Sequence, residues 1–380
     1  MISAFDDYPI HQTSSPIAQP GPSDRNYYDR YWFNGFEREG AFVFEVGFGQ
    51  YPNRFVQDGH FTVSLGGVQH SFHTSGRAPE DRAHTVSGPL RIEVVKPLRI
   101  TRVVLESNDS GIEVDLTFRG RTVPTEEPKN VMHEGTRLIM ETSRFTQFGT
   151  WEGTIKVDGK TLDVSPATTL GIRDRSWGLR PVGEGMGGAP APSTEEPGVY
   201  WCWSPVHFDD VCTQFGTFED HAGHATQLSA AMVPAYASVG EIPEGREPGH
   251  QEMTSAKHRI KYEKGTRRPA SAELELVARD GDRHVITLEP MIRCQVMGIG
   301  YQHPEWGHGI WHGEEATGHE SWVLADLDPL DYKHIHLHSI CKATMKSDSG
   351  QTRTGVATIE TLCFGTHEPS GFKDFLDGAE

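Results

Sequence analysis

Short segments in which apolar and polar residues alternate recur along the chain. The clearest, rich in β-branched and aromatic residues, are 41–46, 61–65, 100–105, 111–118 and 273–277. Because successive side chains of a strand point to opposite faces, this period of two predicts β-strands with one buried face. No long stripe of helical period interrupts them. The pattern therefore predicts an all-β fold.

Turn residues separate these segments at short intervals. The pairs Asp158-Gly159 and Asp280-Gly281 are hairpin signals, because both central positions of a tight hairpin turn favour positive φ. Many short strands with regular turns are typical of sandwiches and barrels.

The composition of the chain argues against two functional classes, nucleic-acid binding and membrane spanning. The chain has 380 residues, with 53 acidic against 35 basic side chains, and a formal net charge of -18. Phosphate binding needs a basic face, so we expect no nucleic-acid partner. No apolar run is long enough for a transmembrane helix, so we expect no membrane span.

The first twenty residues lack the basic start and apolar core of a secretory signal. The chain has five cysteines, an odd number that excludes complete pairing, and they lie far apart. Reduced, buried thiols and a cytoplasmic localisation are the expectation.

The segment 171–181 carries the strongest local motif, with four charged or aromatic side chains in five residues. On a strand, Arg173, Arg175 and Trp177 share one face, and Asp174 lies on the other with Ser176. One interpretation is an aspartate held ionised by arginines in a structural role. The other is a tryptophan wall beside an acid or an anchor for an apolar substrate.

This motif resembles the Asp-His-x-Trp-Gly type found in carotenoid 1,2-hydratase and AttH-like proteins, members of the lipocalin-like (calycin) superfamily. The segments 31–35, 49–53 and 306–309, together with Asp58, resemble a bacterial branch of the same superfamily. Because this architecture carries different chemistries, the resemblance bears more on fold than on reaction.

The resemblance implies two lipocalin-like antiparallel β-barrels in one chain. The expected organisation is an N-terminal arm over 1–28, a first barrel over 29–182, a Gly/Pro-rich loop or linker over 183–198 and a second barrel over 199–380.

The sequence departs from the hydratases at two points. Arg175 stands where they carry histidine, and the strand after the linker has its nearest acids, Asp209 and Asp210, late and at an expected turn. A related acid/base reaction on another hydrophobic substrate is therefore favoured over hydration of a carotenoid.

A second cluster lies in 301–315. If the chain is a strand from Gly307 onward, His308, His312 and Glu314 share one face. Two imidazoles and a carboxylate in this arrangement are compatible with an acid/base pair, with metal ligation, or with a polar strand whose histidines are satisfied by hydrogen bonds.

A third cluster places His334, His336 and His338 on one face of an expected strand. These histidines either face outward or toward the other barrel, or they line the cavity; a His-x-His pair is also a weak zinc signal. The common metalloprotease, nucleotide-binding and serine-hydrolase motifs do not occur, and no cofactor is expected.

We therefore predict a cofactor-independent lyase, hydratase or isomerase that acts by acid/base chemistry on a small hydrophobic molecule of aromatic, terpenoid or polyketide type. The predicted catalytic residues are His308, His312 and Asp174, and the predicted substrate-binding residues are Arg175 as an anion anchor, Trp177, Glu314, Trp203 and Tyr31. A non-catalytic carrier, or a metal-dependent enzyme built on His334 and His336, are the alternatives, and a homo-oligomer is compatible with each of them.

Overall fold

The computed structural model describes residues 2–11, 14–182 and 198–380. Within these residues it contains β-strands and short 3-10 helices, and no α-helix. The predicted loop or linker falls outside the described residues, except for Gly198. None of the described helices has the length and apolar character needed to cross a membrane.

Fourteen strands form sheet A, in which all pairings are antiparallel and the longest path runs β22-β4-β3-β2-β1-β13-β11-β8-β7-β6-β5. The strands are β1 (Tyr27–Glu37), β2 (Phe42–Tyr51), β3 (Val56–Leu65), β4 (Val68–Arg77), β5 (Val86–Ser87), β6 (Leu90–Lys96), β7 (Ile100–Leu105), β8 (Glu113–Gly120), β9 (Thr125–Glu126), β10 (Asn130–Glu134), β11 (Arg137–Val157), β12 (Lys160–Val164), β13 (Thr169–Leu179) and β22 (Glu315–Val323).

Ten strands form sheet B, also antiparallel, with the main path β18-β17-β16-β14-β24-β23-β21-β20-β19. They are β14 (Val199–Trp203), β15 (Val206–His207), β16 (Val211–Glu219), β17 (Ala225–Pro234), β18 (Gln251–Glu252), β19 (Ser255–Tyr262), β20 (Pro269–Val277), β21 (Arg283–Gln295), β23 (Leu337–Ser347) and β24 (Thr352–Phe364). The 3-10 helices are η1 (Ala4–Asp7), η2 (Pro52–Arg54), η3 (Val239–Glu241), η4 (Val296–Ile299), η5 (Leu324–Asp326), η6 (Tyr332–His334) and η7 (Glu368–Ser370).

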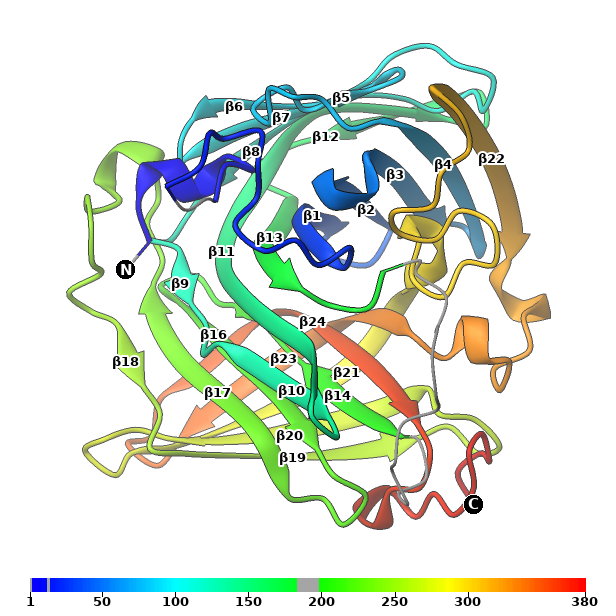
Figure 1. Ribbon diagram of the computed structural model, residues 1–380. Helices are drawn as coiled ribbons and strands as arrows, with labels where there is room; N and C mark the ends of the chain where they lie inside the picture. Colours follow the sequence, from blue (N-terminus) through cyan, green and yellow to red (C-terminus); the bar gives the residue numbers. More distant parts are fainter. Residues whose placement is uncertain (1, 12–13, 183–197) are drawn as a thin grey trace.

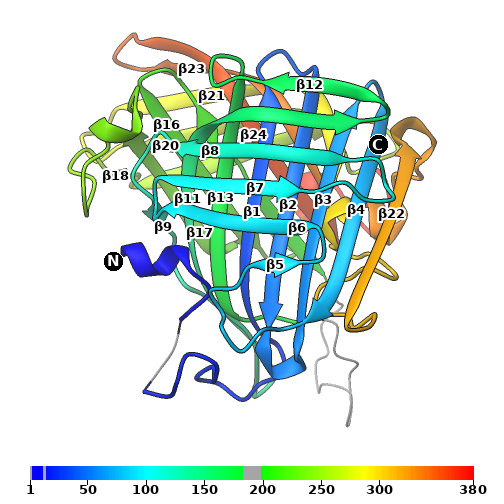
Figure 2. The same cartoon turned by 90° about the horizontal axis from the view of Figure 1, so that it is seen from above.

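Each sheet curls around its own apolar core, so the chain forms two lipocalin-like β-barrels that pack against each other (Figures 1 and 2). In sheet A the last strand of the path, β5, approaches β4, the second strand from the other end: Thr74 of β4 and Ser87 of β5 share a hydrogen bond of 3.1 Å between their hydroxyl oxygens. The predicted fold class is confirmed.

The predicted strands and the first predicted turn agree closely with the structure. The predicted strand 100–105 coincides with β7, and the other four overlap β2, β3, β8 and β20. Asp158 and Gly159 have φ of 49° and 69°, as the two-residue turn between β11 and β12 requires. At the second predicted hairpin only Gly281 has positive φ, at 90°, so that turn is of another type.

Two features join the barrels. A third apolar core, which includes Trp32, Phe148, Trp203 and Ile340, lies between the sheets. In addition, β22 comes from the C-terminal half of the sequence but pairs with β4 along its whole length, from Glu315 opposite Gly76 to Val323 opposite Val68. The second half of the chain thus supplies the edge strand of sheet A.

Candidate active site between the barrels

The alternation predicted for β13 is present, and it directs Asp174 toward sheet B. Asp174 is paired with Trp32 of β1. The Trp32 ring contacts Trp203 and His338 of sheet B edge-on, with ring centroids 5.6 and 5.3 Å away. Because residues directly opposite each other on paired strands point to the same face, Asp174 lies between the two barrels.

Arg144 of β11 is the cation beside this carboxylate, with its Nη1 4.0 Å from Oδ2 of Asp174. Its Nη2 donates to Glu127, which is buried. The guanidinium carbon lies 5.1 Å from the ring centroid of Trp201 and 5.5 Å from that of Trp203. The cation is therefore held in place by one carboxylate and two indole rings.

The environment of Asp174 favours its protonated form. Burial raises the pKa of Asp174 to about 7, and the charges of Glu127 and Glu360 act in the same direction. Arg144 and Arg180 oppose this shift without cancelling it. A carboxyl group that keeps its proton near neutral pH can act as a general acid.

Sheet B supplies the opposite wall through His336, His338 and Glu360. Nε2 of His336 is 2.7 Å from Oε1 of Glu360, and Nδ1 of His338 is 2.6 Å from Oε1 of Glu45, a fully buried residue of β2. Burial lowers the pKa of His338, but Glu45 and Glu360 outweigh it and raise this pKa to about 10. Although burial acts the other way, the hydrogen bond from His336 and the nearby imidazole of His338 hold the pKa of Glu360 well below its usual value.

Of the predicted catalytic and substrate-binding residues, Asp174 and Trp203 are the two that the structure brings to this place, beside His336 and His338 of the predicted histidine cluster. Trp203 is 1% exposed, and its indole Nε1 has no hydrogen-bond partner among the described residues. A buried donor without a partner is costly. The N–H of Trp203 is thus available to an acceptor on a bound molecule.

Arg175, Trp177 and Tyr31 lie elsewhere, on the interior face of the first barrel. Arg175 donates to Asp29 at 2.6 Å and its guanidinium carbon lies 4.0 Å from the Tyr31 ring centroid. The Tyr31 hydroxyl donates to a main-chain carbonyl of η1 at 2.6 Å, and Trp177 stacks on His11 at 3.6 Å between centroids. Arg175 is therefore neutralised by a buried carboxylate of β1, and Tyr31 and Trp177 contact the N-terminal segment. All three lie apart from Asp174.

The strand predicted from Gly307 onward is wrong. Residues 307–314 form a loop between η4 and β22. Gly309 and Gly313 have φ of 69° and 133°, values that break the extended backbone. The two histidines and the glutamate expected to share a face are consequently not aligned.

Each of these three residues has its own surroundings. His308 is buried, accepts from Nη2 of Arg180 at 3.0 Å through Nδ1, and lies 2.8 Å from a main-chain carbonyl of η4 through Nε2. Burial holds the pKa of His308 well below its usual value. His312 stacks on Trp306 and bonds a main-chain carbonyl at 3.0 Å, while Glu314 pairs with an exposed arginine of β4.

The three histidines of the third predicted cluster do not all lie on one strand. His334 belongs to η6, where its Nδ1 lies 2.9 Å from a main-chain carbonyl, because β23 begins only at Leu337. His336 and His338 face Glu360 and sheet A, which is one of the two orientations expected for them.

A further histidine cluster was missed by the sequence analysis. His60 and His73 are joined through their Nδ1 atoms at 2.9 Å, and Nε2 of His73 lies 3.0 Å from Oε1 of Glu320 in β22. Nε2 of His303 lies 2.5 Å from the same oxygen. The members come from four separate segments, so no sequence spacing could have grouped them.

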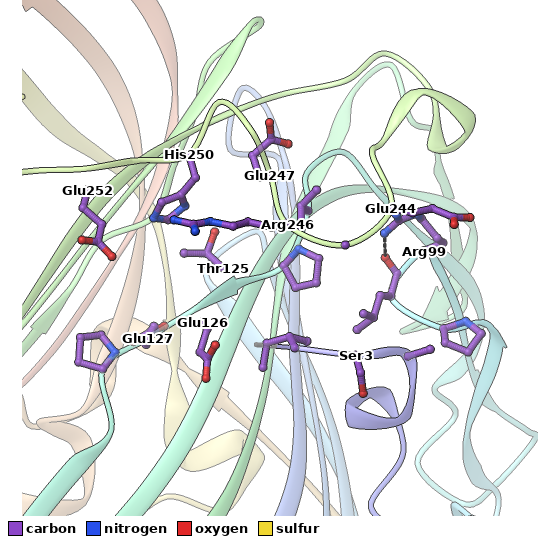
Figure 3. Close-up of a pocket in the computed structure, with 18 of the residues that line it drawn as sticks. Ser3, Arg99, Thr125, Glu126, Glu127, Glu244, Arg246, Glu247, His250 and Glu252 are labelled. Atoms are coloured by element: carbon purple, nitrogen blue, oxygen red, sulfur yellow. Dashed lines mark hydrogen bonds between the residues drawn. The ribbon is translucent and has the colours of Figure 1, made fainter.

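A cavity of about 970 Å³ adjoins the site (Figure 3). It is lined by η1, the 96–99 turn, residues 123–129 and the 244–252 connection, and by none of the residues predicted from the sequence. Glu127 lines the cavity and also holds Arg144, so the cavity and the surroundings of Asp174 share this carboxylate.

Fold and site thus define a protein of two lipocalin-like barrels with a buried polar site between them. The chain belongs to a family of unknown function (DUF8625), whose model matches residues 2–373. No curated protein matches it.

Among solved structures, the chain is similar to an AttH protein from Nitrosomonas europaea, with 12% identity, a TM-score of 0.50, and coverage of 88% of this chain and 92% of that one. Kievitone hydratase from Nectria haematococca has 14% identity, a TM-score of 0.48 and coverage of 87% and 88%. CghA bound to Sch210972 has 10% identity, a TM-score of 0.45 and coverage of 89% and 88%. At these identities, the likeness to AttH bears on the fold alone.

Proposed function

We propose that the protein is a lyase, hydratase or isomerase that transfers a proton to a small hydrophobic molecule, with Asp174 as the proton donor. The observation that carries this proposal is the placement of Asp174 between the barrels, beside Arg144 and the Trp203 indole. The three reaction types share a step in which a positioned acid protonates the substrate and its conjugate base later accepts a proton.

The surroundings of Asp174 also favour a class of substrate. Trp32, Trp201 and Trp203 offer apolar ring faces and edges, which suit an aromatic, terpenoid or polyketide-type molecule. The unpartnered N–H of Trp203 and the guanidinium of Arg144 are donors for an oxygen on that molecule.

This proposal gives the acid role to Asp174 rather than to His308 or His312. Both ring nitrogens of His308 are engaged, one by the Arg180 guanidinium and one by a main-chain carbonyl. His312 lies in the same loop, stacked on Trp306. Neither histidine is hydrogen-bonded to Asp174, whose nearest cation among the described residues is Arg144.

The test uses deuterium transfer. The purified protein is incubated in D₂O with a panel of aromatic, terpenoid and polyketide-type alkenes and alcohols, and products are analysed by mass spectrometry. We expect at least one member to be converted with uptake of a solvent deuteron. Asp174→Asn should lower this conversion about 100-fold or more, the range typical of general-acid catalysis.

Asp115→Asn is the control, because Asp115 of β8 pairs with Arg102 at the surface of the first barrel and its substitution should leave turnover unchanged. Full turnover by the Asp174→Asn variant would remove the assigned proton donor. Tight binding by the wild-type protein, with every ligand recovered unaltered and undeuterated, would instead identify a carrier.

A further inference from the structure

We propose that His336, His338 and Glu360 bind a divalent transition-metal ion of the zinc type on the sheet B wall of the interbarrel site. His338 and Glu360 are directly opposite each other on β23 and β24, and His336 precedes His338 by two positions. Two imidazoles and one carboxylate are a donor set that zinc uses in proteins. The inference concerns binding and does not depend on the proposed reaction.

The three donor groups already converge. Their ligand atoms lie within 4.8 Å of one another. Oε1 of Glu360 is 2.7 Å from Nε2 of His336, and Oε2 of Glu360 is 3.5 Å from Nε2 of His338. Two tetrahedral ligands at about 2.1 Å from one ion are about 3.4 Å apart, so only small side-chain shifts are required.

Glu45 orients one of the ligands. Its carboxylate accepts from Nδ1 of His338 at 2.6 Å, and a carboxylate has no proton to give back, so Nδ1 carries the hydrogen. Nε2 of His338 therefore points to Glu360, and it has no hydrogen-bond partner among the described residues. A carboxylate behind a histidine ligand is the usual support for a metal-binding imidazole.

Charge favours the same occupant. Glu45 is 0% exposed and the side chain of Glu360 is 14% exposed, so two carboxylates are withdrawn from water next to His338. Buried carboxylates need a compensating positive charge. A divalent ion bound to Nε2 of His338 and to Glu360 supplies two positive charges, one more than the Nε2 proton that it displaces.

The other cluster of two histidines and a glutamate provides a contrast. Nδ1 of His303 accepts from the main-chain N–H groups of Glu305 and Trp306, at 3.1 and 2.7 Å. The ring proton therefore lies on Nε2, directed at Glu320. Nε2 of His336 also donates to a carboxylate, but its Nδ1 has no hydrogen-bond partner among the described residues, so the ring proton can move there and free Nε2 for a metal. His303 has no such alternative position for its proton, so we assign the His73, His303 and Glu320 cluster to hydrogen bonding rather than to metal.

The test measures binding directly. The full chain, purified without a histidine tag and stripped with a chelator, is titrated with Zn²⁺, and bound metal is counted by elemental analysis; Co²⁺ absorption reports the ligand field. We expect about one ion per chain. His336→Gln and Glu360→Gln should each lower affinity at least 100-fold, and Glu45→Gln should lower it about tenfold.

His303→Gln is the matched control, a comparably buried histidine in contact with a glutamate, and it should bind zinc as the wild type does. Circular dichroism of each metal-free variant verifies folding. A wild-type protein that binds no zinc, or Co²⁺ without an imidazole ligand field, overturns the proposal even if a variant fails to fold. So does an affinity that falls for His303→Gln but not for His336→Gln. Because the readout is bound metal, failure of the proposed proton transfer leaves this result unaffected.

Discussion

For Asp174, the sequence predicts the direction of the side chain but not its protonation state. Its opposite orientation to Arg173 and Arg175 follows from the period of a strand, and the structure confirms it. Its protonation does not follow from the local sequence, because the charges that favour the neutral form come from Glu127 and Glu360, 47 and 186 positions away.

The pH dependence of turnover is the first prediction at this scale. Since burial raises the pKa of Asp174 to about 7, its proton-donating form is present below pH 7 and lost above it. We expect kcat to fall by about tenfold for each pH unit above 7. A pH–rate profile of the wild-type protein measures this. A rate that rises through pH 7 and stays high would assign the group a role as base.

The same shift makes a prediction about stability. A carboxyl whose folded pKa is raised from 3.8 to about 7 binds its proton more tightly in the folded state, so folding stability decreases as pH rises between these values. Asp174→Asn, which cannot ionise, should raise the free energy of unfolding by up to about 4 kcal/mol at pH 8.

The measurement is urea unfolding at pH 5 and pH 8. Most of the gain should appear only at the higher pH, and Asp163→Asn, a substitution in β12, serves as the control. An equal effect of Asp174→Asn at both pH values would mean that the side chain does not change its charge in the folded protein.

At the scale of elements, the sequence predicted the strands and turns that depend on neighbouring residues alone. The strand period located β7 and β8, and Asp158-Gly159 located a turn. It failed after residue 307, where histidines and a glutamate at alternating positions imitate a strand, but glycines with positive φ turn the backbone into a loop. Alternation of polar residues without an apolar face to bury gives no energetic reason for a strand.

The candidate site was predicted only in part for a related reason. Asp174 and Trp203 were among the predicted residues, and His336 was a predicted ligand in the alternative hypothesis of a metal-dependent enzyme. Their neighbours depend on pairings between distant segments, such as Glu45 with His338, 293 positions apart. Such contacts depend on how the two sheets pack, and the alternation of residues within one segment carries no information about this packing.

The attachment of β22 to sheet A gives a prediction at this scale. Burial raises the pKa of Glu320, but hydrogen bonds from His303 and His73 outweigh it and lower this pKa to about 2. The stabilisation is thus present above the ordinary pKa of 4.5 and is lost as pH falls toward 2. Glu320→Gln should cost about 1–2 kcal/mol at neutral pH, with allowance for the 31% exposure of the side chain.

Urea unfolding from pH 7 to pH 3 measures this difference, which should shrink below pH 5. Glu315→Gln, an exposed position on the same strand, is the control and should have little effect. Faster amide exchange confined to β22 and β4 would locate the loss. A constant difference at every pH would exclude the ionised carboxylate as its source.

For the whole molecule, the shared core and the exchanged strand predict that the two barrels unfold together. The interbarrel core contains five buried aromatic side chains, which come from both sheets, and β22 completes sheet A from the second half of the sequence. Neither half can keep these contacts alone, because separation exposes the core face and the edge of β4.

Differential scanning calorimetry of the full chain should accordingly show one transition, with a calorimetric enthalpy close to the van't Hoff enthalpy. A fragment over 29–182 should unfold at a lower temperature or aggregate, since it lacks β22. Adding β22 by a linker to the end of that fragment should restore part of its stability, whereas a scrambled β22 sequence should not. Two separated transitions in the full chain would show that each barrel is stable on its own and that the interbarrel contacts contribute little to folding.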